Sequence, residues 1–215
     1  MNLYRRKDFN DIAAEVSAGP EFKLLGTRFT AEAGYGQRWY GMEPFQNQWR
    51  LWASATRPIG TVSQLRLDAS YRSTNYKLND LQDGHGLSAA LRFERALSPS
   101  TSVSAFVSRD RFSARDDAYS TRSWAAGLTA YRDVGRMTLS LGGELGRLKA
   151  DERLLLLPEA REDKYSRLTF GAVFRQLTVA GFAPMTRLVL ERNKSTVEFY
   201  DFKRAHTEFG LSRAF

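Results

Sequence analysis

The chain has 215 residues, a net charge of +8 and no cysteine, so it suits one domain and excludes disulfides and thiolate catalysis. Its mean hydropathy is −0.45, and its longest apolar stretch, 154–157, is far shorter than the roughly 20 residues of a membrane-spanning helix. A transmembrane β-barrel is still allowed, because its polar lumen-facing residues lower the average hydropathy. The basic residues are spread along the chain, which argues against a nucleic-acid partner.

Apolar and polar residues alternate with a period of two in eleven segments, the pattern of strands that have one apolar face. In the second segment, for example, Phe29 and Ala31 fall on one face and Thr30 and Glu32 on the other. In chain order the segments are 11–18, 28–39, 48–56, 64–72, 87–93, 103–107, 124–130, 137–145, 168–174, 188–190 and 208–215.

The polar faces of these segments carry charged residues near their centres. In a dry protein core each unpaired charge would cost several kcal/mol, whereas a water-filled lumen removes that cost. Trp39, Tyr71, Trp124 and Tyr131 lie toward segment ends, as in the aromatic girdles of outer-membrane barrels. The sequence therefore predicts an all-β fold, an antiparallel transmembrane β-barrel, in preference to a soluble sandwich or lipocalin-like fold.

The predicted connections alternate between short and long, as do the periplasmic turns and extracellular loops of bacterial barrels. We expect short connections at 57–60, 96–100, 133–135 and 178–183, and long ones at 40–46, 74–86, 110–122, 148–164 and 193–204. This order places Phe215 in the periplasm and the start of segment 11–18 outside the cell. Bacterial barrels have even strand numbers, so either the strand count is wrong by one or an odd number of amino-terminal strands is missing. No signal peptide is evident, which favours missing strands.

The predicted lumen face carries a series of arginines that allows two interpretations. They form a basic strip that guides an anionic passenger, or they pair with Glu32, Asp68 and Glu94 to brace the wall, and bracing is favoured. The lumen-facing arginines are Arg28, Arg38, Arg50, Arg66, Arg72 and Arg92.

No catalytic motif accompanies these arginines. The two histidines, His85 and His206, lie far apart without a second ligand at metal-binding spacing. We therefore expect neither an enzyme nor a cofactor or metal. The charged run from Arg109 to Arg115 is expected to form an extracellular loop; its basic groups could pair with lipopolysaccharide phosphates, although a solvated loop is the simpler interpretation.

The carboxy-terminal part of the chain has a more specific pattern. The turn Phe174-Arg-Gln-Leu-Thr-Val-Ala-Gly-Phe-Ala-Pro184, the strand at 186–195 and the aromatic loop at 197–204 resemble the end of the Slam (surface lipoprotein assembly modifier) family. The last strand, 207–215, also resembles that family and carries the barrel signature Phe209, Leu211 and Phe215. The resemblance is specific over 165–215; over 1–164 it depends on strand pattern and spacing.

The resemblance implies a fourteen-stranded barrel that follows a periplasmic tetratricopeptide-repeat domain. Residues 1–215 are then one outer-membrane β-barrel domain, without the repeat domain and some amino-terminal strands. The resemblance implies a bacterial outer-membrane protein that translocates or displays lipoproteins at the cell surface, through a polar lumen and a lateral seam. The alternative is a passive porin-like channel for small solutes. The expected partners are outer-membrane lipids or lipopolysaccharide, the barrel assembly machinery at the carboxy-terminal strand, and a lipoprotein passenger.

Overall fold

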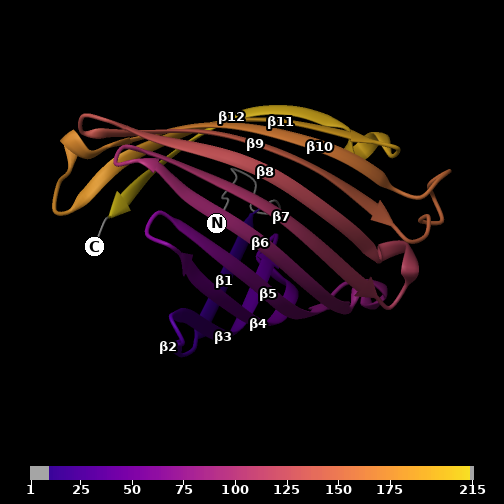
Figure 1. Ribbon diagram of the computed structural model, residues 1–215. Coiled ribbons are helices and arrows are strands. Elements are labelled where there is room, and N and C mark those ends of the chain that lie inside the picture. Colours follow the sequence, from indigo (N-terminus) through magenta and orange to yellow (C-terminus); the bar gives the residue numbers. More distant parts are fainter. Residues whose placement is uncertain (1–9, 214–215) are drawn as a thin grey trace.

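The computed structural model describes residues 10–213 as one antiparallel sheet that curls into an open arc (Figure 1). The first two strands both pair with the third, and every later strand pairs with its neighbours in the chain, so the first and last strands lie at opposite ends of the order. The strands are β1 (Asp11–Ala18), β2 (Glu21–Leu24), β3 (Thr27–Tyr40), β4 (Glu43–Ile59), β5 (Ser63–Tyr76), β6 (Gly84–Ser98), β7 (Thr101–Ala114), β8 (Thr121–Val134), β9 (Met137–Ala150), β10 (Glu162–Phe174), β11 (Phe182–Ser195) and β12 (Phe202–Arg213).

Short helical turns occupy four of the connections. They are η2 (Asp80–Gln82), η3 (Asp117–Tyr119), η4 (Arg175–Leu177) and η5 (Glu198–Tyr200). Within residues 10–213, no helix has the length and apolar character needed to cross a bilayer.

Strands β1 and β2 form one continuous line along β3. Ala18 faces Ala33 and Glu21 faces Thr30, so the register is the same on both sides of the break. The break falls at Gly19-Pro20, where a side chain on Gly19 would overlap the backbone of β3. Proline has no N–H to donate, which interrupts the ladder at this point. Twelve strands therefore occupy eleven positions in the sheet, which confirms the predicted number.

The two faces of the sheet differ in the way that the alternation predicts. Large apolar side chains are exposed on the convex face, among them Leu51, Leu128 and Leu145, which are 57%, 58% and 62% exposed. Polar residues of the concave face, such as Ser104 and Asn193, are buried because side chains converge on the inside of a curled sheet. The described residues thus have a polar interior and an apolar coat, the reverse of a soluble domain.

The connections segregate by length at the two ends of the sheet, with one exception at each end. One end carries 25–26, 60–62, 99–100, 135–136 and the longer 175–181; the other carries 41–42, 77–83, 115–120, 151–161 and 196–201. The structure has shorter connections at the second end than predicted, because the strands run on beyond the apolar segments. We call these two ends the short-turn end and the long-loop end.

The long connection expected at 40–46 is wrong. Gly41 and Met42, with φ angles of 61° and 72°, make a tight two-residue turn between β3 and β4. Two successive positive φ angles match the twist of a hairpin. Pro44 lies within β4 beside a register shift at Trp39, where a missing N–H is tolerated.

The loop expected from Arg109 to Arg115 is also wrong. Strand β7 continues to Ala114 and stays paired with β6 as far as Gly84 and with β8 as far as Thr121. Backbone pairing on both sides keeps this charged segment extended, although it lacks the apolar alternation that identified the other strands.

Candidate functional site

The concave face of the sheet is the candidate site, because it gathers most of the charged side chains of the strand interiors. The six arginines predicted to face the lumen all lie on this face, on strands β3 to β6. They are Arg28, Arg38, Arg50, Arg66, Arg72 and Arg92.

Four of the six arginines form ion pairs with carboxylates. Arg38 donates to both oxygens of Asp11, at 2.8 and 2.6 Å. Arg66 pairs with Asp68 at 2.9 Å. The other two pairs are Arg28 with Glu21, at 3.6 Å, and Arg50 with Glu15. Three of the four pairs join different strands of the wall, as a bracing role requires, whereas Arg66 and Asp68 both lie on β5.

Two of the partners suggested from the sequence are wrong. Glu32 accepts a hydrogen bond from Ser17 at 3.2 Å, and Glu94 accepts one from Gln64. Only Asp68 of the three expected carboxylates holds an arginine. The reason is register: the carboxylates of β1 and β2, which the alternation does not align, come closer to the arginines of β3 and β4.

Glycines make one of these contacts possible. Glu15 of β1 and Arg50 of β4 lie on either side of β3, facing Gly36 and Gly34 respectively. Without side chains at these two positions, the ion pair passes over the intervening strand. The glycine pair therefore thins the inner face at this point. Gly143, in contrast, lies on the convex face between Leu141 and Leu145.

Arg72 and Arg92 contact aromatic rings instead of carboxylates. The Arg72 guanidinium lies 5.5 Å from the ring centre of Phe112, and Arg92 lies 5.2 Å from that of Phe106. Arg92 also donates to the Ser104 hydroxyl at 3.2 Å. Cation–π contact holds each side chain against the wall, and within the part of the chain that the structure describes neither guanidinium forms an ion pair.

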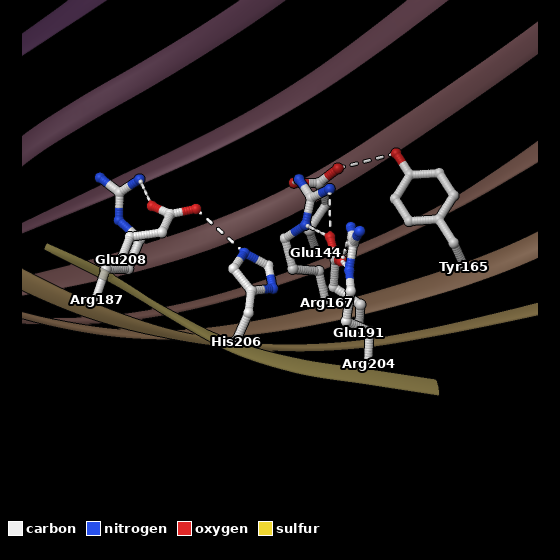
Figure 2. Close-up of polar contacts among 8 residues, drawn as sticks. All are labelled: Glu144, Tyr165, Arg167, Arg187, Glu191, Arg204, His206 and Glu208. Carbon is white, nitrogen blue, oxygen red and sulfur yellow. Dashed lines mark hydrogen bonds and ion pairs between the residues drawn. The ribbon is translucent and has the colours of Figure 1, made fainter. Parts of the chain in front are cut away.

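A second charged network covers the concave face of β9 to β12 (Figure 2). At its centre Glu191 accepts hydrogen bonds from Arg167 and Arg204, each at 2.8 Å. Glu144 accepts from the Tyr165 hydroxyl at 2.9 Å and lies 3.6 Å from Arg167. One chain of contacts thus crosses four strands, which ties the last strands of the sheet together.

A smaller cluster lies beside this network on the last two strands. Glu208 contacts Arg187 and His206, each at 3.2 Å, as Figure 2 shows. Both groups line one cavity of about 480 Å³. His206 is the only member that the sequence singled out; the others share the concave parity of their strands, and that signal could have identified them.

The concave face carries charged and polar side chains, and the structure shows no metal site on it within the residues that it describes. No group of three or more metal-ligating side chains occurs among residues 10–213. His85 lies on the convex face, stacked on Tyr71 with ring centres 6.3 Å apart. The arrangement suits a hydrated wall that is braced by its own ion pairs.

The carboxy-terminal signature lies mainly on the convex face. Phe209 and Leu211 of β12 are 83% and 67% exposed, and they point away from the charged network. Phe215 lies outside the described residues.

Comparison with solved structures supports the barrel fold. The copper transporter OprC matches with a TM-score of 0.53 at 12% identity, over 97% of this chain and 42% of that one. The chain thus spans less than half the length of that transporter. The translocator domain of the autotransporter NalP from Neisseria meningitidis matches with a TM-score of 0.43 at 13% identity, over 95% of this chain and 80% of that one.

Comparison of sequences identifies the family. No curated protein matches the chain significantly. The sequence profile of the surface lipoprotein assembly modifiers matches residues 2–215, nearly the whole chain, although the motifs that carried the resemblance lie within 165–215. The chain therefore belongs to the surface lipoprotein assembly modifier family.

Proposed function

We propose that this chain forms part of the wall of an outer-membrane translocation barrel that delivers lipoproteins to the bacterial cell surface. The observation that carries the proposal is the reversed distribution of side chains on a sheet of this family: apolar residues coat the convex face and ion pairs line the concave face. Such a sheet is stable where lipid surrounds it and water fills it.

The concave wall supports passage of a polypeptide better than capture of one ligand. Its carboxylates are mostly engaged with arginines of the same wall, as Glu191 is with Arg167 and Arg204. A passenger therefore meets a hydrated surface on which most of the carboxylates are already paired. No catalytic step is assigned to the wall.

A free edge of the sheet suggests how a lipid-anchored segment could leave the lumen. In the described residues, β1 pairs only with β3 and β12 only with β11. An edge strand presents unpaired backbone N–H and C=O groups. We assign the free edge of β12, the last strand, to one side of the lateral seam through which a lipid-anchored segment leaves the lumen. The exposed Phe209 and Leu211 make β12 the strand that the barrel assembly machinery would recognise.

Surface labelling of intact cells tests the proposal without knowledge of the passenger. Cells with and without the full-length gene are treated with a membrane-impermeant biotin reagent, and labelled lipoproteins are quantified by mass spectrometry. We expect at least one lipoprotein to lose surface label in the deletion strain, while its total amount is unchanged, and to regain it on complementation. An unchanged labelled set would reject the role.

Conductance separates this function from a passive channel. The charges of Arg72 and Arg92, which form no ion pair within the described residues, would favour anions in an open pore. A steady, anion-selective conductance of the purified protein in planar bilayers, together with an unchanged set of surface lipoproteins, would instead identify a solute channel.

A further inference from the structure

Three arginines converge on the convex face near the long-loop end. Arg109 and Arg111 of β7 and Arg122 of β8 line one cavity together with Asp151. Arg111 and Arg122 are direct cross-strand partners. Like charges in that arrangement destabilise a sheet, so the cluster requires a negative counter-charge.

The protein supplies only part of that counter-charge. Asp151 accepts from Arg111 at 2.8 Å. Within residues 10–213, the side chains of Arg109 and Arg122 make no hydrogen bond or ion pair, and Arg122 reaches Asp151 only by longer-range attraction. On the neighbouring strand Arg147 and Lys149 share the single carboxylate of Glu162. This part of the convex face therefore keeps a positive surplus.

The cluster lies at the border of the apolar coat. Toward the short-turn end, the same face continues with Val107 and Leu128, which are 55% and 58% exposed. Trp124 lies between Arg109 and Arg147 in the register of β7, β8 and β9. Tryptophan concentrates at membrane interfaces, and arginine binds phosphate oxygens in pairs. In the outer-membrane location proposed above, on which this inference depends, the cluster faces the headgroups of the outer leaflet.

An apolar groove begins at the cluster. It has a volume of about 920 Å³, and Arg109 and Arg111 lie at one end of its lining. Ala53, Ala69 and Ala89 form a row across β4, β5 and β6 that is in register with Arg109. These small side chains leave room on the convex face for an acyl chain whose headgroup is held by the arginines.

We infer that Arg109, Arg111 and Arg122 bind the phosphate groups of an acylated glycolipid of the outer leaflet, with one acyl chain in the alanine-lined groove. The lipid supplies the counter-charge that the protein lacks. It also fixes β7 and β8 against the leaflet while the seam strand β12, at the end of the sheet, remains free to move.

Lipid binding by the purified full-length protein in detergent micelles tests this site. The probe is bis-phosphorylated lipid A, and binding is followed by native mass spectrometry. We expect the double variant R109Q/R122Q to bind it at least tenfold more weakly than the wild type. The matched control R72Q/R92Q removes the same charge from the concave face and should bind like the wild type. Circular dichroism and heat-modifiable gel mobility confirm that each variant is folded.

Two further probes separate the lipid from simpler ligands. Dephosphorylated lipid A should bind the wild type as weakly as R109Q/R122Q binds the phosphorylated form. Inorganic phosphate at millimolar concentration should not displace lipid A. Equal binding by R109Q/R122Q, equal binding of dephosphorylated lipid, or displacement by inorganic phosphate would each overturn the assignment. The assay needs no passenger, so its failure leaves the surface-labelling test of translocation unaffected.

Discussion

Glu191 shows how a single carboxylate can hold several strands of a wet wall together. Its side chain is only 9% exposed and accepts from arginines on both neighbouring strands. We expect Glu191→Ala to lower the free energy of unfolding by about 1–3 kcal/mol, because Arg204 then loses its carboxylate acceptor and Arg167 keeps only the more distant Glu144. Urea unfolding in micelles, followed by tryptophan fluorescence, measures the change.

Glu208→Ala is the matched control for Glu191→Ala. Glu208 also contacts two side chains, Arg187 and His206, but it is 44% exposed. Water replaces the lost contacts there, so the expected loss is below about 1 kcal/mol. An equal decrease in the free energy of unfolding of the two variants would show that the burial of Glu191 adds nothing to stability.

Asp151, in the connection between β9 and β10, makes part of the arginine cluster sensitive to pH. Its hydrogen bond from Arg111 holds the pKa of the carboxyl below its ordinary value of 3.8. A depressed folded-state pKa means that the pair stabilises the protein above the unfolded pKa of about 3.9, and this contribution disappears as pH falls through the folded value. A carbon-13 NMR titration should give Asp151 a midpoint below 3.8. In Arg111→Gln the midpoint should return toward the ordinary value; a midpoint that does not move would contradict the pairing.

At the scale of the strand, β9 provides a test of how tightly the concave face is packed. A side chain on Gly146 would overlap the Tyr165 ring, which is hydrogen-bonded to Glu144. Gly146→Ala should therefore displace the ring and reduce the free energy of unfolding by about 1–3 kcal/mol. Gly143, on the convex face of the same strand, has nothing within 4 Å of an added Cβ.

Gly143→Ala should consequently be neutral or slightly stabilising, because glycine is unfavourable in a strand. Denaturant titration of Gly146→Ala and Gly143→Ala measures the free energy of unfolding of each. A similar loss in Gly143→Ala would show that the effect of Gly146→Ala comes from the backbone and not from the tyrosine.

The strands could be predicted where period-two alternation is strong, and the exceptions have local causes. The β3–β4 turn was missed because Met42, a residue that rarely adopts positive φ, occupies one of its two positions. The continuation of β7 was missed because its charged residues hide the alternation. The concave position of the arginines follows from the alternation of side chains along a strand. Their partners, however, depend on the cross-strand register and on positions without a side chain, such as Gly34, and a single sequence does not reveal how strands are aligned.

For the whole molecule, the described sheet is stable only if its two faces have different surroundings. Its buried apolar residues are few and small, Ala125, Ala183, Val189 and Val197. Burial of a core therefore contributes little, and backbone pairing, concave ion pairs and contact of the convex face with lipid hold the sheet together. Because long loops of bacterial barrels face outward, we expect the long-loop end, beside the arginine cluster, on the outer side of the membrane.

This orientation can be tested because the chain has no cysteine of its own. Single cysteines are introduced by Glu159→Cys in the 151–161 connection and by Arg136→Cys in the 135–136 turn, both exposed positions. A membrane-impermeant maleimide should label Glu159→Cys on intact cells, because long loops of bacterial barrels face outward. Arg136→Cys should react only after the outer membrane is permeabilised. The reverse labelling pattern would show that the sheet has the opposite orientation in the membrane. The arginine cluster would then face the periplasmic leaflet, which contains no phosphorylated glycolipid, and the proposed lipid site would be wrong.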